Sequence, residues 1–172
     1  SDPRAEIIHQ DARQYLKETS NRFDVAIIDL VEPLEEGPAC LLYTREFYEL
    51  LKNCLNPGGI VTVQSGAAGM VNSKYFAAVV STLKSVFSVI RPYQVYVPSF
   101  VELWGFTTAS MSLDPLILSA ADVDARIASK VSVELKSYDG ISHQALFSLS
   151  KHLRQDILTT TRILTDADPL LI

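Results

Sequence analysis

The stretch Phe23-Asp24-Val25-Ala26-Ile27-Ile28-Asp29 decides how this chain folds. It is an apolar run that one acid enters and another acid ends. A short, bounded run of this kind predicts a strand buried on both faces, as in a parallel sheet. Open α/β sheets bind ligands outside the carboxyl ends of their strands, so Asp29 is predicted to lie at a ligand-binding edge.

Strands and helices alternate on both sides of this run. Before it, residues 5–9 predict a short strand and residues 11–17 a short helix. After it, periodicity and the Pro and Gly positions predict a helix over 44–54, a strand over 60–64, a helix over 76–87, and strands over 89–97 and 104–109. The loop between the last two strands is too short for a crossover helix, so these strands must be antiparallel.

This order predicts an α/β fold whose parallel sheet carries helices on both faces and ends in an antiparallel hairpin. Class I methyltransferase-like (Rossmann-like) sheets end in the same order, and the strands expected to come first are absent here. The chain has no strand–Gly-x-Gly–helix unit. We therefore expect either a fragment or a chain that binds no adenosyl cofactor by the usual route.

The tail predicts two further helices. Ser119-x-x-Asp122 is similar to a capping box, with Asp in place of Glu or Gln, and it precedes an apolar periodic segment. A second helix is predicted from about Gln144 to Ile157.

Composition excludes several classes of function. The net charge of −5 argues against nucleic acid as a partner and suits a cationic small molecule. No apolar run reaches the ~20 residues of a membrane helix. Neither the two cysteines, Cys40 and Cys54, nor the scattered histidines have metal-binding spacing, so no metal site is predicted. A reducing, cytoplasmic compartment is the default expectation.

Acidic side chains gather around the decisive strand. Residues 23–44 hold five acids and no Lys, Arg or His, which most often means a solvated acidic loop. Asp29 and Gln64 each lie at the carboxyl end of a predicted strand, Asp11 follows another, and Glu32 lies three residues after Asp29. Asp11 or Gln64 alone would be read as a turn or cap residue. Together, the four predict a crevice whose carboxylates accept a proton from an amine and hold further ammonium groups.

Several segments together form a recognisable signature. They are Asp29-Leu30-Val31-Glu32-Pro33, Gly37-Pro38, Leu42-Tyr43-Thr44, Phe47-Tyr48, and Pro98-Ser99-Phe100 through Trp104-Gly105-Phe106. This signature resembles that of the spermidine/spermine synthase family, the polyamine aminopropyltransferases. Within the family the chain is most similar to thermospermine synthases, which carry Asp-Leu-x-Asp-Pro where this chain has Asp29-Leu30-Val31-Glu32-Pro33. Gln64-Ser65-Gly66-Ala67-Ala68-Gly69 and Val97-Pro98-Ser99-Phe100 also fit that version. The resemblance covers nearly the whole chain and corresponds to the C-terminal part of such enzymes.

The resemblance implies roles on the polyamine side. Asp29 would be the catalytic base beside the attacking amine, and Glu32 would hold a substrate amine. Gln64 would hydrogen-bond in the polyamine channel, and Phe100 would form an aromatic wall. Tyr43, in the matched Leu-Tyr-Thr segment, would also bind substrate.

It also implies roles on the nucleoside side. Asp11 would accept a hydrogen bond from the adenine amino group, and Ala12 would offer backbone to the ring. Leu30 would lie near the nucleoside sulfur, and Pro38 would pack near adenine.

The implied reaction moves an aminopropyl group from decarboxylated S-adenosylmethionine, a co-substrate, to a polyamine, with no prosthetic group. Spermidine to thermospermine or spermine is favoured, and putrescine to spermidine is possible. The resemblance further implies a homodimer. It divides the chain into residues 1–112, the C-terminal part of a Rossmann-like catalytic domain, and residues 113–172, a helical extension packed on it.

Two departures from the family pattern leave alternatives open. Glu32 stands where the family has Asp, so the carboxylate moves by about one bond length. The N-terminal half, with the glycine-rich turn and the ribose-binding acid, is not in this sequence, so the chain alone is expected to be inactive. The alternatives are a small-molecule S-adenosylmethionine-dependent methyltransferase and a non-catalytic polyamine-binding or dimerisation module.

Overall fold

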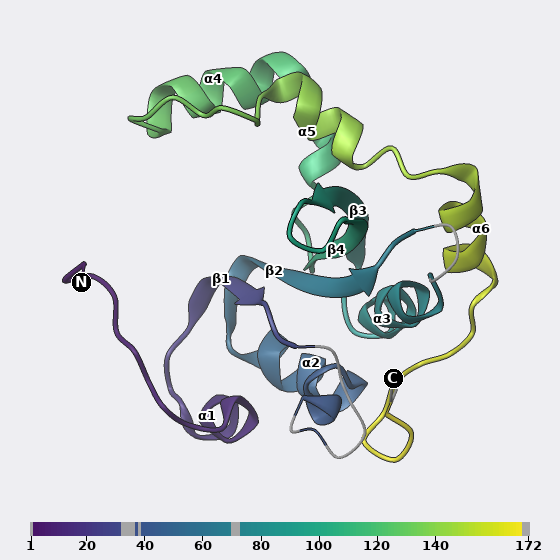
Figure 1. The fold of residues 1–172 in the computed structure, drawn as a ribbon. Helices are drawn as coiled ribbons and strands as arrows, with labels where there is room; N and C mark the ends of the chain where they lie inside the picture. The colour runs from purple at the N-terminus through teal and green to yellow at the C-terminus, as the bar shows by residue number, and fades with distance from the viewer. Residues whose placement is uncertain (1, 32–36, 38, 70–72, 170–172) are drawn as a thin grey trace.

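The centre of the molecule is one mixed sheet (Figure 1). The computed structural model describes residues 2–31, 37, 39–69 and 73–169. The strands are β1 (Phe23–Ile28), β2 (Leu55–Ala67), β3 (Val89–Val97) and β4 (Glu102–Ser110), in the order β1-β2-β4-β3. β1 runs parallel to β2, whereas β4 runs antiparallel to both β2 and β3. The predicted α/β fold with a closing antiparallel pair is confirmed.

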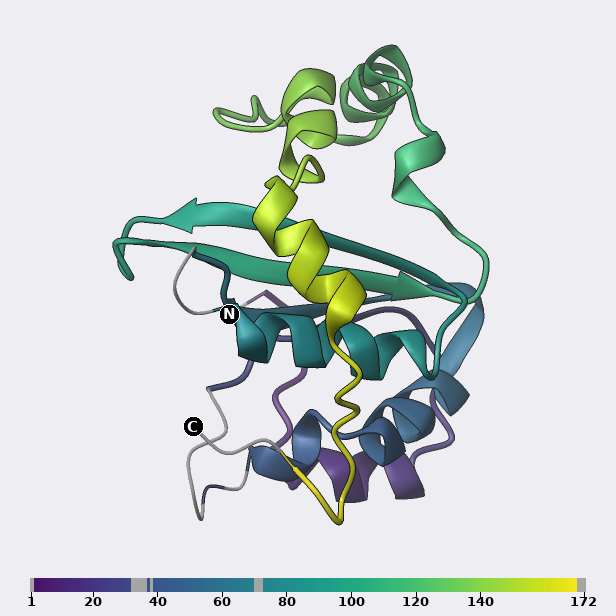
Figure 2. The ribbon, with the colours of Figure 1, turned by 90° about the vertical axis from the view of Figure 1, so that its right-hand side faces the viewer.

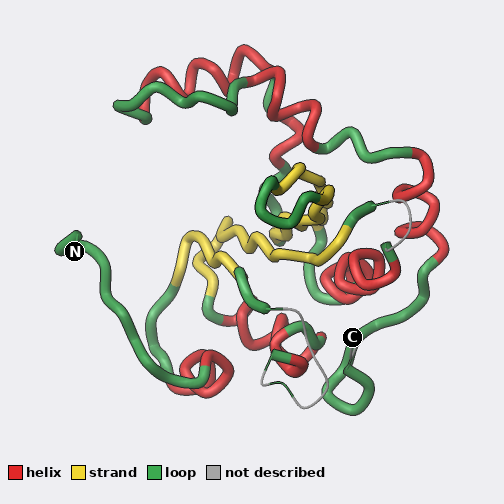
Figure 3. The backbone as a smooth tube through the Cα atoms, in the orientation of Figure 1, coloured by secondary structure: helices red, strands yellow, loops and turns green. Residues whose placement is uncertain are grey.

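Helices lie on both sides of this sheet. They are α1 (Ala12–Glu18), α2 (Arg45–Asn53), α3 (Lys74–Lys84), α4 (Ala120–Lys130), α5 (Gly140–Leu146) and α6 (Lys151–Thr159), with short 3-10 turns η1 (Cys40–Leu42) and η2 (Pro115–Ile117). α2 and α3 lie on one side of the sheet, and α4 and α5 lie on the other (Figures 1 and 3). α6 runs past the edge of the sheet and packs against α3 (Figure 2).

The hydrophobic core lies between the sheet and helices α2 and α3. Its buried side chains include Phe47, Tyr48 and Leu51 from α2, Phe76, Val79, Val80 and Leu83 from α3, and Val61 and Val63 from β2. Burying one such aliphatic or aromatic side chain stabilises the fold by about 1.5–3 kcal/mol. Leu153, Ile157 and Leu164 belong to the same core, so the C-terminal residues are tied to the sheet through α3.

Two sequence predictions about elements are wrong. Residues 5–9 form no strand, because no described strand lies beside them to accept their backbone hydrogen bonds, and Ile7 and Ile8 are exposed. The single helix expected from Gln144 to Ile157 is two helices, α5 and α6. The break follows from Ser150, whose side chain accepts a hydrogen bond from the backbone N–H of Leu153 and starts a new helix. The capping box that opens α4 is confirmed.

β2 is longer than the sequence predicts. It continues past Gln64 to Ala67, so Gln64 lies within the strand rather than at its end. The register against β4 shifts between Gln64 and Gly66, where Gly66 has a φ of +85°. A Cβ on Gly66 would lie 2.2 Å from Cδ1 of Tyr75. Only glycine therefore fits this bulge, which lets the strand continue beyond the point where a loop was expected.

No helix in the described parts of the chain is long and apolar enough to cross a membrane.

Candidate active site

Asp29 leaves the sheet directly beside Gln64. Ile28, the last residue of β1, pairs in parallel register with Val63 of β2, so the next residues of the two strands are neighbours. Parallel strands present their carboxyl ends at one edge, which is the edge where α/β sheets bind ligands. Asp29 is exposed there, and Gln64 is half-buried behind it.

The side-chain amide of Gln64 links Asp29 to the sheet. The O and N atoms of this amide are assigned from their hydrogen-bond partners. Nε2 donates to Oδ1 of Asp29 at 2.8 Å and to the carbonyl oxygen of Leu30 at 2.8 Å. Oε1 accepts a hydrogen bond from the indole Nε1 of Trp104 at 3.0 Å. The carboxylate is thus held by a side chain that is itself fixed on its other side.

Aromatic rings continue this line of contacts. Trp104 of β4 is buried, and its ring lies 4.6 Å, centroid to centroid, from that of Phe100 at an interplanar angle of 49°. Phe100 is 51% exposed and lies at the solvent end of the line of contacts that runs from Asp29 through Gln64 and Trp104. Cations are attracted to such ring faces.

Tyr43 supports the backbone that follows Asp29. Its ring is buried and meets Tyr75 edge-on at 5.7 Å between ring centroids. Its hydroxyl donates to the carbonyl oxygen of Leu30 at 3.3 Å, the same oxygen that Gln64 contacts. These two donors on one carbonyl hold the backbone immediately after Asp29. Because the ring of Tyr43 is buried, Tyr43 positions this backbone in the structure.

The residues predicted for the nucleoside lie on a separate element. Oδ1 of Asp11 accepts a hydrogen bond from the backbone N–H of Gln14 at 2.7 Å and caps α1, and Ala12 is the first residue of that helix. Both are exposed. No hydrogen bond joins Asp11 to Asp29 or Gln64 in the described parts of the chain, whereas Asp29 and Gln64 contact each other directly.

Two predicted site residues, Glu32 and Pro38, lie outside the described residues. Leu30 is half-buried and packs against the hydrophobic core.

Trp104 belongs to the site, although its position in the sequence does not by itself indicate a site residue. It is the only tryptophan of the chain, and the sequence matched it only as part of a segment. Its place depends on the register of β4 against β2, in which Trp104 pairs with Ala67 beyond the bulge. The sequence predicts a shorter β2 that ends at Gln64, so it does not predict the contact between the indole of Trp104 and the side chain of Gln64.

The arrangement is suited to an amine. A fixed carboxylate can attract a cation and accept a proton from a nitrogen atom, and the exposed ring of Phe100, linked to it through Trp104 and Gln64, can also attract a cation. Among the described residues no group of three or more His, Cys, Asp or Glu side chains is placed to hold a metal ion.

Comparison with known proteins assigns the chain to a family. The sequence model of the spermine/spermidine synthase domain matches residues 1–117. A polyamine aminopropyltransferase 2 of Hyperthermus butylicus is 40% identical over 172 residues, which are 100% of this chain and 56% of that protein. One from Pseudomonas aeruginosa is 41% identical over 169 residues, covering 98% of this chain and 48% of that protein.

Solved structures agree with the sequence matches. A spermidine synthase in complex with the transition-state analogue AdoDATO superposes with a TM-score of 0.77 at 29% identity, covering 92% of this chain and 53% of that one. The spermidine synthase of Thermotoga maritima gives a TM-score of 0.75 at 28% identity, with 92% and 52% covered. The chain therefore spans about half the length of the relatives it matches. It belongs to the spermine/spermidine synthase family, whose relatives found here are polyamine aminopropyltransferases.

Proposed function

We propose that the complete protein transfers the aminopropyl group of decarboxylated S-adenosylmethionine to an amine of a polyamine. The observation that carries this proposal is the fixed carboxylate of Asp29, held by Gln64 at 2.8 Å at the ligand-binding edge of the sheet. The names of relatives that are about 40% identical support the same reaction class.

Asp29 is the proposed base in this step. The neutral amine nitrogen attacks the aminopropyl carbon, a C–N bond forms, and the C–S bond breaks with its electron pair passing to sulfur. The products are 5′-methylthioadenosine and an alkylated ammonium, which gives its proton to the carboxylate of Asp29. The sulfonium is a good leaving group, so the protein mainly aligns the amine and removes the proton, and the step needs no prosthetic group.

The polyamine would lie along the line from Asp29 past the aromatic rings. Phe100 and its neighbour Trp104 supply ring surface for an alkylammonium chain. Gln64 positions the base, Tyr43 steadies the backbone behind it, and Glu32 is proposed to grip a second ammonium group on the strength of its place in the signature.

The nucleoside would lie toward α1. Asp11 has one carboxylate oxygen engaged in the helix cap, and the other has no hydrogen-bond partner among the described residues. That second oxygen is available to the adenine amino group, with Ala12 offering backbone beside it. Leu30 would contact the region of the sulfur, and Pro38 the adenine ring. The remaining contacts, including those to the ribose, would come from the other half of the protein.

The proposed acceptor is spermidine, with thermospermine or spermine as product, and putrescine is the second candidate. This rests on the Asp29-Leu30-Val31-Glu32-Pro33 segment, which resembles thermospermine synthases more than other family members. A cytoplasmic homodimer completes the proposal.

The deciding experiment uses the complete protein in two steps. Isothermal titration compares decarboxylated with ordinary S-adenosylmethionine, and tighter binding of the decarboxylated form is expected because aminopropyl transfer has no use for the carboxyl group. Tighter binding of the carboxylated form would favour a methyltransferase and refute the proposal. Incubation with putrescine and with spermidine, followed by chromatography, then identifies the product. Spermidine as sole product, made from putrescine, would refute the proposed acceptor.

A further inference from the structure

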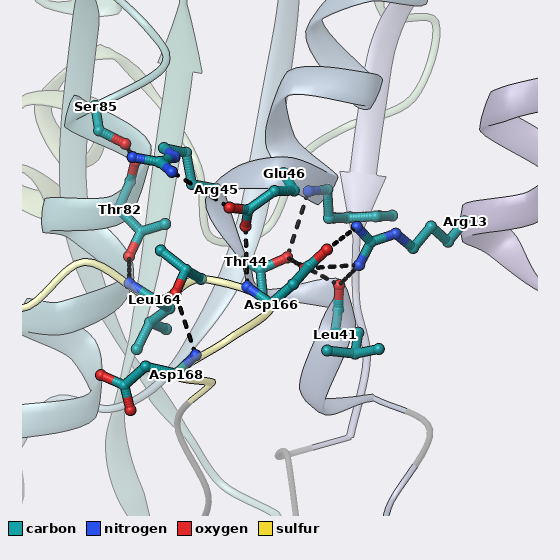
Figure 4. Close-up of polar contacts among 12 residues, drawn as sticks. Arg13, Leu41, Thr44, Arg45, Glu46, Thr82, Ser85, Leu164, Asp166 and Asp168 are labelled. Carbon is teal, nitrogen blue, oxygen red and sulfur yellow. Dashed lines mark hydrogen bonds and ion pairs between the residues drawn. The ribbon is translucent and has the colours of Figure 1, made fainter.

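The residues after α6 form a strap over 160–168 that returns to the start of α2 (Figures 2 and 4). Leu164 anchors it, because its side chain is fully buried in the core. Its backbone N–H donates to Oγ1 of Thr82 in α3 at 2.9 Å, and its carbonyl oxygen accepts from the N–H of Arg45 at 2.8 Å. The strap is therefore fixed to both core helices before it reaches Asp166.

Asp166 makes three polar connections from this anchored position (Figure 4). Its Oδ1 accepts from Oγ1 of Thr44 at 2.7 Å and from Nη1 of Arg13 at 2.8 Å. Its Oδ2 accepts from Nη2 of Arg13, which makes the pair bidentate. Its backbone N–H donates to Oε2 of Glu46 at 3.0 Å. The guanidinium of Arg13 and the hydroxyl of Thr44 lower the pKa of the Asp166 carboxyl, so it is ionised at neutral pH.

These contacts join two segments that flank the candidate site. Arg13 follows Ala12 in the first turn of α1, the helix that Asp11 caps. Thr44 follows Tyr43, whose hydroxyl contacts Leu30. Nη1 of Arg13 also donates to the carbonyl oxygen of Leu41 at 3.2 Å, in the turn η1 between the Asp29 loop and α2. One carboxylate thus ties the start of α1 to the end of the loop that begins at Asp29.

α1 is held near its C-terminal end by Leu16, which is partly buried against the core and whose carbonyl oxygen accepts a hydrogen bond from Sγ of Cys54 at 3.4 Å, and in its first turn by Arg13. It is seven residues long and has no fully buried residue. A helix this short is unstable in isolation, so tertiary contacts must decide its orientation. The bidentate Arg13–Asp166 pair is an oriented contact, and the Arg13 side chain is only 16% exposed. The direction in which Asp11 points therefore depends on the strap.

We propose that Asp166 is a positioning residue for nucleoside binding: through Arg13 and Thr44 it holds α1, and with it Asp11 and Ala12, at a fixed distance from the Asp29 loop. Asp166 does not touch the substrates. The inference rests on the proposed function, because it takes Asp11 and Ala12 as the nucleoside-binding residues. Residues more than 150 positions apart are joined in this way.

The test is the Asp166→Asn variant of the complete protein, titrated with 5′-methylthioadenosine. Loss of the charged, two-bond pair is expected to weaken nucleoside binding about tenfold. The matched control is Asp168→Asn, because Asp168 lies in the same strap but pairs with Arg162, away from α1. We expect the control to bind like the wild type. With saturating co-substrate, turnover of Asp166→Asn should stay within about twofold of wild type, since Asp166 takes no part in the chemical step.

Further variants separate positioning from general loss of stability. Leu153→Ala removes a buried side chain of α6 and should lower the melting temperature without changing nucleoside affinity. Arg13→Lys keeps the charge but loses the planar fork, so it should bind more weakly than wild type and more tightly than Asp166→Asn. Arg13→Lys also replaces Asp166→Asn as the test variant if Asp166→Asn fails to fold.

The outcomes are distinct. The inference would be overturned if Asp166→Asn bound the nucleoside as tightly as the Asp168→Asn control. If Asp166→Asn does not fold, the same comparison is made with Arg13→Lys. A loss of affinity in Leu153→Ala as large as in Asp166→Asn would also overturn the inference. A wild-type protein that binds no 5′-methylthioadenosine would instead refute the proposed function, before any variant is compared.

Discussion

At the scale of single residues, the site depends on one amide. The side chain of Gln64 donates hydrogen bonds to Asp29 and to the Leu30 carbonyl and accepts one from the indole N–H of Trp104. A base that is already oriented loses little freedom when the amine arrives, which favours proton transfer. The sequence placed Asp29 and Gln64 at the same edge of the sheet, but it did not show that they touch.

We predict that Asp29→Asn lowers turnover by about two to four orders of magnitude, because an amide cannot accept the proton. Nucleoside binding should change little, since the amide is the same size. The control is Asp24→Asn at the other end of β1, where Asp24 accepts a hydrogen bond from Asn56 on the surface. Steady-state kinetics of both variants in the complete protein provides the comparison. Turnover of Asp29→Asn close to that of the control would remove Asp29 from its role.

Trp104→Phe is predicted to lower turnover several-fold while keeping the aromatic contact with Phe100. It deletes the N–H that holds Oε1 of Gln64, and leaving a buried polar atom unpaired costs about 1–3 kcal/mol, so the half-buried Gln64 should lose part of that amount. Gln64→Leu should cost at least as much. If both act through this one hydrogen bond, the double variant should be no worse than Gln64→Leu, and additive losses in turnover would show that they act separately.

At the scale of elements, the bulge in β2 places the end of that strand. The positive φ of Gly66 and the ring of Tyr75 beneath it leave no room for a side chain. The strap does the same for the first turn of α1, a helix that has no fully buried residue. Both elements are positioned by a contact with a distant part of the chain rather than by local preference.

Gly66→Ala is predicted to destabilise the fold more than Gly58→Ala. Both glycines have positive φ, +85° and +80°, so each substitution carries backbone strain of about 1–2 kcal/mol. The new Cβ at Gly58 would find only Leu113 Cδ1, at 4.0 Å, whereas at Gly66 it would clash with Tyr75 at 2.2 Å. Chemical denaturation measures the difference in the free energy of unfolding. Equal losses would show that Tyr75 can move away freely.

The Arg13–Asp166 pair predicts how stability depends on pH. The folded-state pKa of Asp166 lies below that of the unfolded chain, so the unfolded state binds the extra proton as pH falls. The ionised Asp166 contributes fully to the free energy of unfolding above about pH 4, the ordinary pKa of an aspartate. This contribution is lost as the pH falls through the lower pKa of the folded state. The difference in melting temperature between wild type and Asp166→Asn should therefore shrink below about pH 4. A difference that stays constant in acid would contradict this assignment.

At the scale of the whole molecule, one face of the sheet is bare at β1. Val25 and Ile27 alternate along β1 and are 58% and 71% exposed, while Ala26 and Ile28 face the core. On that side α5 contacts β3, and α4 packs on α5 (Figure 1). The chain spans about half the length of its relatives, so in the complete protein further residues are available to cover this apolar surface.

We predict that the chain expressed alone self-associates through this face. Ile27→Lys should shift it toward monomer in size-exclusion chromatography with light scattering, because a charged side chain in an exposed strand opposes sheet-to-sheet contact. The control is Ile141→Lys, since Ile141 is 74% exposed but lies on α5 rather than on β1. Equal effects of both substitutions would indicate a general gain in solubility. The chain alone is also expected to have no transferase activity.

The sequence by itself determined the alternation of helices and strands from residue 11 to residue 110, the position of Asp29 after β1 and the family. These depend on local periodicity and on a contiguous motif, which can be read without coordinates. Only the tertiary structure decided that Gln64 and Trp104 fix Asp29, that residues 5–9 lack a strand partner, and that Asp166 holds Arg13. Those outcomes depend on strand register and on contacts between segments up to 153 residues apart, which local patterns do not encode.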